Sequence, residues 1–171
     1  MKQACCSVIN SDYISYLKGF VYSLLKHNPN FNMDYVVLHS SEFSNQQKDS
    51  LKSLYQNFKF KQINLNNYER LIDPNKLPHG VWAYYKLDAF AIEGYDKVNV
   101  FDVDMLVNKP LDSFFNMRND DSILGCKDEI GCQANPQDYA NDHMYINTGV
   151  LSIGKSFLSK DAYSLIVSNF S

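Results

Sequence analysis

The chain has 171 residues, the length of one ordinary domain and enough to bury a core without disulfides or structural metals. Hydrophobic residues make up 45% and charged residues 20%, as is typical of globular proteins. The formal charge of −3 gives no basic surface for nucleic acid, and no apolar run is long enough to cross a bilayer. We therefore expect one globular domain over residues 1–171, with no nucleic-acid partner and no membrane span.

The N-terminus runs directly into a strand-like segment and lacks the apolar region and cleavage site of a secretory signal. The four cysteines, at positions 5, 6, 126 and 132, lack the spacing and the histidine partners of a zinc site. A disulfide between Cys126 and Cys132 is open, but free thiols in a reducing cytosol suit the pattern better. We therefore predict a cytoplasmic location.

The first half of the chain alternates short apolar runs with segments of helical periodicity. In chain order the predicted elements are a strand at residues 4–9, a helix at 13–27, a strand at 35–38, a helix at 46–57 and a strand at 58–65. Residues 66–80 show little periodicity and are predicted as a loop, with one helical turn near Tyr68.

The second half continues the alternation. The predicted elements are a helix at residues 81–92, a strand at 98–101, a short helix at 111–115, strands at 123–126 and 144–153, and a helix at 156–169. A long polar loop covers residues 127–143. Strands alternating with helices predict an α/β fold, with a Rossmann-like, mostly parallel sheet flanked by helices.

The strongest functional signal lies in residues 98–107, where an apolar run ends in Asp102 and Asp104. On a continuing strand these carboxylates, spaced i and i+2, would face the same side. Open α/β sheets bind ligands beyond the carboxyl ends of their strands. Carboxylates there can hold a hard divalent cation, which in turn can hold a diphosphate. The alternative is a loop-capping aspartate, but carboxylates in apolar sequence are costly to bury unpaired, so we predict a metal site.

Three further features are candidates for ligand contacts. Lys86 follows two tyrosines early in a predicted helix and can reach a phosphate as a point charge, although a surface lysine is the simpler alternative. Residues 147–149, Asn-Thr-Gly inside a strand, suggest a bulge or a close approach to a sugar; the alternative is a plain strand irregularity. Asp128 follows a strand end, where a site residue and a solvated loop residue are equally compatible.

Taken together, these stretches resemble the glycogenin-like glycosyltransferases of family 8, which have the GT-A fold. The similarity covers roughly residues 3–160, in the family's order. Residues 4–13 resemble the first strand and the uridine-binding turn, and residues 86–87 with 95–98 resemble the lead into the metal strand. Residues 101–107 and 111–115 resemble "LDADxLV…LDELF", and residues 145–151 resemble "FNSGV".

The resemblance implies a UDP-sugar donor, a Mn²⁺ or Mg²⁺ ion, a saccharide or glycan acceptor, and transfer with retention. By position it implies Asp102 and Asp104 as metal ligands, and Asp128 and Asn147 as catalytic candidates near the sugar. The residues that it implies in donor binding are Ser7, Ile9, Asn10, Tyr13, Lys86, Asp102, Val103, Asp104, Asn147 and Thr148.

Family members continue beyond the Asn-Thr-Gly segment into an Asp-Gln pair and a later His-x-x-Gly-x-x-Lys-Pro segment, whose histidine completes the metal site. This chain ends at Ser171, before either element, so we expect a domain that is short at its C-terminus relative to the family. Water or a residue of another chain would then supply the third metal ligand, which leaves a homo-oligomer open.

The leading hypothesis is a metal-dependent, retaining hexosyltransferase. The alternatives are a nucleotide-sugar or glycan-binding domain without turnover, and a fragment of a larger glycosyltransferase. A nucleotidyltransferase would carry a glycine-rich, basic loop after the first strand, and residues 10–13 do not form one. The chain has no G-x-G-x-x-G, P-loop or G-x-S-x-G motif, so NAD-dependent enzymes, ATPases and serine hydrolases lack support.

Overall fold

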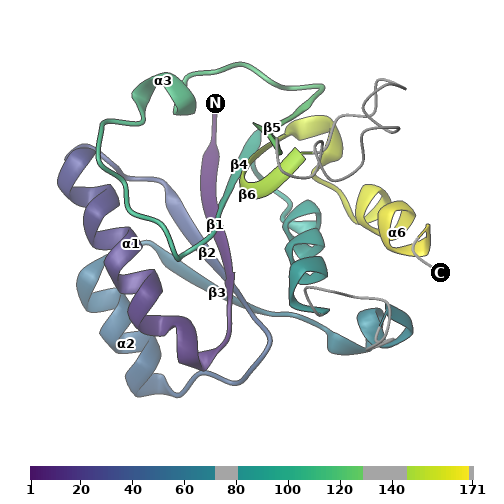
Figure 1. Cartoon of the computed structure of the whole chain (residues 1–171), viewed down its shortest axis with the longest axis horizontal. Coiled ribbons are helices and arrows are strands. Elements are labelled where there is room, and N and C mark those ends of the chain that lie inside the picture. The colour runs from purple at the N-terminus through teal and green to yellow at the C-terminus, as the bar shows by residue number, and fades with distance from the viewer. Residues whose placement is uncertain (72–80, 129–145, 170–171) are drawn as a thin grey trace.

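The computed structural model describes residues 1–71, 81–128 and 146–169, and these form a six-stranded sheet with helices on both faces (Figure 1). The strands are β1 (Gln3–Ile9), β2 (Asp34–His39), β3 (Phe58–Gln62), β4 (Lys97–Phe101), β5 (Ile123–Lys127) and β6 (Ile146–Gly154). The α-helices are α1 (Ile14–His27), α2 (Asn45–Leu54), α3 (Asp112–Phe115) and α6 (Lys160–Ser168). The 3₁₀ helices are η1 (Ser11–Tyr13), η2 (Leu65–Leu71), η3 (Val81–Ala91) and η4 (Lys155–Phe157).

The strand order is β3-β2-β1-β4-β6-β5, and β3, β2, β1 and β4 are parallel. The other strands differ in direction, since β6 runs antiparallel to both β4 and β5. The chain builds outward from β1 through β2 to β3 and then crosses to β4 on the other side of β1. The predicted mostly parallel α/β sheet is confirmed, and the strand order reverses between β1 and β4, where such sheets bind ligands.

Hydrophobic layers cover the two faces of the sheet. Helices α1 and α2 lie side by side on one face, and their apolar residues pack against β1 and β2 (Figure 1). On the other face, η3 and residues of α6 pack against β4 and β6. Alternation along β1 places Cys5 in the first layer and Cys6 in the second, both fully buried as free thiols. Cys132 lies outside the described residues.

The segment after β4 is held against α1 by two polar side chains, Ser23 within the helix and Asn28 just after its end. The Val107 amide donates to Ser23 Oγ at 2.9 Å, and the Leu111 amide donates to Asn28 Oδ1 at 2.7 Å. Asn28 also follows the last turn of α1, where its side-chain nitrogen donates to the Leu24 carbonyl oxygen at 2.8 Å. These bonds satisfy buried backbone groups that no strand partner reaches, and so they set the course of residues 102–111.

Lys97 begins β4 and is almost fully buried, with 1% of its surface exposed. Its ammonium group donates to the carbonyl oxygens of Phe115 at 2.6 Å and Met117 at 2.8 Å, which lie at and just beyond the end of α3. Burial lowers the pKa of Lys97, and the charge of Asp120 opposes this shift. The cation thus satisfies carbonyl groups at the end of α3 that have no partner within the helix, and the Gln3 side-chain nitrogen also donates to the Phe115 carbonyl oxygen at 2.9 Å.

Replacing Lys97 with Met should lower the free energy of unfolding by about 3 kcal/mol, because the buried Phe115 carbonyl group and the part-buried Met117 carbonyl group lose a charged donor. Chemical denaturation measures this difference. The matched control is Lys59→Met on β3, since Lys59 has 61% of its side chain exposed and only a 3.9 Å ion pair to Asp34. The control should change stability by less than about 0.5 kcal/mol, and equal effects of the two substitutions would contradict the assignment.

Candidate functional site

A cavity of about 500 Å³ lies at the carboxyl ends of β1 and β4. This volume is within the usual range of small-molecule sites, roughly 300–1,000 Å³. The cavity is lined by the end of β1 and the turn after it, by residues after β2 and β4, and by η3. The lining residues are Val8, Ile9, Asn10, Tyr13, Ser40, Ala83, Tyr85, Lys86, Asp102, Val103 and Asp104.

Asp102 is the first residue after β4 and forms an ion pair with Lys86 of η3. The Lys86 ammonium lies 2.7 Å from Asp102 Oδ1 and 3.0 Å from Oδ2, so it contacts both carboxylate oxygens. The Asp102 backbone amide donates to the Gly149 carbonyl oxygen at 2.8 Å, which fixes the start of the loop against β6. A charge-assisted contact to both oxygens is among the stronger polar interactions in proteins and fixes the orientation of the carboxylate.

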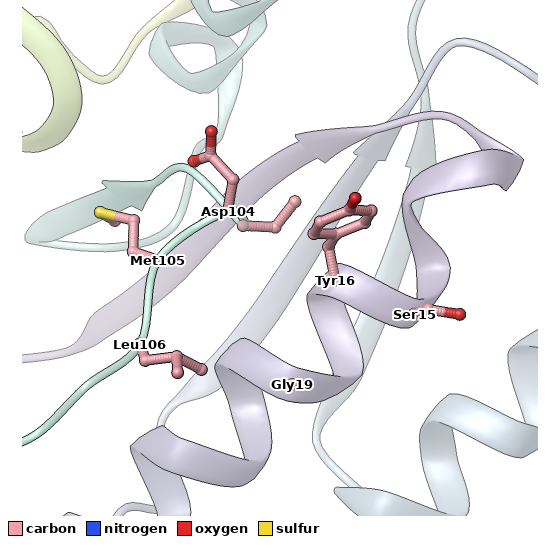
Figure 2. Close-up of a pocket in the computed structure, with 7 residues that line it drawn as sticks. Ser15, Tyr16, Gly19, Asp104, Met105 and Leu106 are labelled. Carbon is pink, nitrogen blue, oxygen red and sulfur yellow. The ribbon is translucent and has the colours of Figure 1, made fainter.

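The strand ends just before the acidic pair, as the predicted range 98–101 has it, so the two aspartates do not lie on a continuing strand. It ends at Phe101, and Asp104 lies in a bend two residues beyond Asp102, because Val103 packs into the α1-side core. Both aspartates nevertheless line the cavity. Asp104 is exposed and also borders a second hollow of about 320 Å³, which Tyr16 of α1 lines as well (Figure 2). The i, i+2 spacing therefore does not act through a strand, and the loop brings the two aspartates to one cavity instead.

The chemistry of this corner fits a divalent cation. Carboxylate oxygens are the ligands that Mg²⁺ and Mn²⁺ prefer, and Asp102 already holds a cation, the Lys86 ammonium. Gly149 leaves room beside it, since a Cβ there would lie 3.3 Å from Asp102 Oδ2 and 2.9 Å from Asn147 Oδ1. Within the described residues, no cluster of three or more His, Cys, Asp or Glu side chains surrounds such an ion.

The predicted uridine-side residues fall into two groups. Ile9, Asn10 and Tyr13 line the cavity, and 47% of the Tyr13 surface is exposed. The Asn10 side chain accepts from the Asp12 amide at 2.9 Å and thereby shapes the turn. Ser7 forms the second group: its side chain is fully buried, and it is not among the residues that line the cavity.

The physical reason is the alternation of side chains along β1, which turns Ser7 toward the core shared with α1. The Ser7 hydroxyl donates to the Phe101 carbonyl oxygen at 2.7 Å and lies 2.6 Å from the Tyr35 hydroxyl. Ser7 therefore ties β1 to its neighbours β2 and β4.

Asn147 and Thr148 lie at the start of β6, beside the ion pair. Lys86 donates to Thr148 Oγ1 at 3.2 Å and to its carbonyl oxygen at 3.3 Å. Asn147 Oδ1 accepts from the Gly149 amide at 2.8 Å. The predicted irregularity is confirmed: Gly125 pairs with Leu151, but the next residue, Cys126, pairs with Asn147. Residues 148–150 therefore bulge from the β5 ladder.

Asp128 follows β5 directly and is half-buried, and it is not among the residues that line the cavity. Sequence reasoning missed four lining residues, Val8, Ser40, Ala83 and Tyr85. Ser40 follows the carboxyl end of β2, and the parallel-sheet argument could have found it. Ala83 and Tyr85 carry no such signal, because their place depends on how η3 packs against the sheet.

Comparison with known proteins agrees with this arrangement. Residues 4–159 match the sequence model of Glycosyl transferase family 8. The chain belongs to this family. A search of curated proteins found no match. Among solved structures, the galactosyltransferase LgtC in complex with donor and acceptor sugar analogs aligns with a TM-score of 0.83 and 19% identity, over 98% of this chain and 63% of that chain.

More distant structures share the same fold. The glycosyltransferase GlyE from Streptococcus pneumoniae TIGR4 aligns with a TM-score of 0.69 and 16% identity. The alignment covers 99% of the present chain and 38% of the GlyE chain. The core-mannan synthase CmsA/Ktr4 from Aspergillus fumigatus, in its Mn/GDP form, has a TM-score of 0.62 and 9% identity, over 99% and 65%. The fold is therefore that of GT-A glycosyltransferases, and this chain spans less than two thirds of each of these proteins.

Replacing Gly149 with Ala should lower the free energy of unfolding by about 1–3 kcal/mol, because the new methyl group forces the Asn147 side chain off the Gly149 amide. Thermal and chemical unfolding measure the change. The matched control is Gly19→Ala on α1, where a Cβ meets no atom within 4 Å, and this variant should be unchanged or slightly more stable. In an Asn147→Ala background the Gly149→Ala cost should shrink, and an undiminished cost would contradict the proposed contact.

Proposed function

We propose that residues 1–171 form the nucleotide-sugar-binding domain of a metal-dependent, retaining glycosyltransferase, which transfers a hexose from a UDP-sugar to a saccharide or glycan acceptor. One observation carries this proposal. Asp102, Asp104 and Lys86 meet at a cavity of ligand size, at the point where the strand order reverses. The two carboxylates there can attract a metal ion, and the Lys86 ammonium can attract a diphosphate. Binding of a nucleotide-sugar needs both.

The nucleoside end of the donor belongs at the turn after β1. There Tyr13 offers an exposed ring face to the uracil, and Ile9 and Asn10 complete the wall. Aromatic faces hold nucleobases by stacking. Val103 contributes backbone groups beside the diphosphate, because its side chain is buried in the α1-side core. Asn10 also keeps the turn in shape through its bond to the Asp12 amide.

The reacting end of the donor belongs between the acidic pair and β6. Asp102 and Asp104 would hold Mn²⁺ or Mg²⁺, which when bound neutralises the charge that develops on the departing diphosphate. Lys86 adds a positive charge to the same group, and stabilising developing charge is usually the largest catalytic contribution. Asn147 and Thr148 offer an amide and a hydroxyl to the hydroxyl groups of the sugar, and we place Asp128 on the acceptor side.

Membership of family 8 supports glycosyl transfer. The names of the similar structures support a sugar donor, a sugar acceptor, a nucleoside diphosphate and Mn²⁺ as ligands. LgtC is described with donor and acceptor sugar analogs, and CmsA/Ktr4 is described in a Mn/GDP form. We favour UDP over GDP because residues 4–13 resemble the uridine-binding strand of the family.

We also propose a cytoplasmic location. Cys5 and Cys6 are buried as free thiols on opposite faces of β1, as suits a reducing compartment. In the part of the chain that the structure describes, no helix combines the length and apolar character that crossing a membrane requires.

UDP with Mn²⁺ should raise the melting temperature, because a ligand that binds only the folded state stabilises it by about 2.7 kcal/mol at a hundredfold excess over its Kd. Asp104→Asn should remove this shift, and a chelator should remove it from the wild type. Differential scanning fluorimetry measures the effect. The matched control, Asp49→Asn on the exposed face of α2, should keep the full shift. An undiminished shift in Asp104→Asn would exclude Asp104 as a metal ligand.

Turnover should appear as release of UDP when the protein is incubated with Mn²⁺ and a panel of UDP-hexoses, with or without saccharide acceptors. One donor is expected to release UDP faster than the others, and Asp102→Asn should reduce that rate at least about a hundredfold, as expected for lost electrostatic stabilisation of the leaving group. A coupled assay for UDP measures the rate. Ligand-dependent stabilisation with no UDP release from any donor would favour the alternative, a nucleotide-sugar-binding domain without turnover.

A further inference from the structure

The Lys86 ammonium is held by four oxygen atoms at once. It contacts Asp102 Oδ1 at 2.7 Å and Oδ2 at 3.0 Å, and it contacts Thr148 Oγ1 at 3.2 Å and the Thr148 carbonyl oxygen at 3.3 Å. Only 18% of the Lys86 side chain is exposed, against 37% for Asp102. These contacts place an organic cation on the carboxylate oxygens that a metal ion would use.

We propose that Lys86 occupies Asp102 in place of the metal ion, so that the divalent cation binds only together with a nucleoside diphosphate. The inference rests on the proposed function and concerns the order in which the same site fills. In this role Lys86 prevents free metal ions from binding at Asp102, and it also contacts the donor.

The charge balance of the site supports this order. A divalent cation added to the two carboxylates and the Lys86 ammonium gives a corner with net positive charge. Like charges that share one carboxylate repel each other strongly in a partly buried place. A diphosphate reverses this situation, because its oxygens coordinate the metal ion and also accept hydrogen bonds from Lys86.

The contacts also show which partner can move. Asp102 is fixed at both ends, by β4 before it and by the bond from its amide to the Gly149 carbonyl oxygen. The Lys86 ammonium lies at the end of a flexible stem and borders the cavity. A diphosphate in the cavity therefore draws Lys86 away from Asp102, while Thr148 remains within its reach.

The two aspartates differ in what a free metal ion would meet. Asp104 is exposed, and no hydrogen bond or ion pair engages its carboxylate among the described residues, whereas both oxygens of Asp102 are engaged. A metal ion alone would thus have one available carboxylate and water. A single exposed carboxylate is a weak site for a hard cation, which usually needs several oxygen ligands in a fixed arrangement.

The test is a titration of the intact chain with Mn²⁺, with and without saturating UDP, followed by the electron paramagnetic resonance signal of free Mn²⁺. In the wild type, UDP should raise the affinity for Mn²⁺ by a factor in the upper part of the usual coupling range, about 5–150-fold. In Lys86→Met, the affinity for Mn²⁺ alone should rise about tenfold and the coupling to UDP should fall by at least the same factor.

Two further variants keep the test decisive. Lys52→Met, on the exposed face of α2, is the matched control and should behave like the wild type. Lys86→Arg keeps a positive charge near Asp102 and should keep the affinity for Mn²⁺ alone low, even if Lys86→Met folds poorly by circular dichroism. Wild-type affinity for Mn²⁺ alone in a folded Lys86→Met, or a rise in that affinity in Lys86→Arg, would overturn the inference.

The outcome also separates this inference from the proposed function. If UDP and Mn²⁺ together fail to bind the wild type, the proposed function is wrong. If they bind together but Lys86→Met leaves the affinity for Mn²⁺ alone unchanged, the donor site stands and only the role of Lys86 as a substitute cation is wrong.

Discussion

The parallel pairing of β1 with β4 is the constraint on which the site depends. The register that joins Cys6 to Val100 brings the carboxyl ends of both strands to one edge of the sheet. The turn that holds Asn10 and Tyr13 and the loop that holds Asp102 and Asp104 therefore open onto one cavity. Buried groups reinforce this pairing, since the Ser7 hydroxyl bonds to the last carbonyl group of β4 and to Tyr35 of β2.

The loop after β4 has no strand partner, and its position depends on α1. Ser23 and Asn28 accept hydrogen bonds from the amides of Val107 and Leu111, so the last turns of α1 and the residue after them hold the segment that follows Asp104. Buried amide groups without such partners would cost about 1–3 kcal/mol each. The geometry of the acidic pair is thus a property of helix and loop together, and it survives although the strand stops at Phe101.

Much of this arrangement could be predicted from the sequence, because the spacing of apolar residues over short stretches indicates a helix or a strand. The strands and helices, the acidic pair at a strand end and the irregularity at residues 147–149 all follow from short patterns. The buried hydrogen bonds of Ser7 could not be predicted, because a small polar residue on a strand suits a buried hydrogen bond and a ligand equally well. The partnership of Lys86 with Asp102 joins residues 16 positions apart on different elements, and no local pattern encodes it.

The reversed direction of β6 has a consequence for the site. Because β6 is antiparallel to β4, Phe101 pairs with Val150, and the first residues of β6 reach the carboxyl edge of the sheet. A parallel strand in this place would bring its opposite end there, with Ile153 and Gly154 in place of Asn147 and Thr148. The β4–β6 register continues one step beyond Phe101, so the Gly149 carbonyl group accepts from the Asp102 amide. The antiparallel strand β6 therefore adds a hydroxyl, an amide and a backbone acceptor beside the acidic pair.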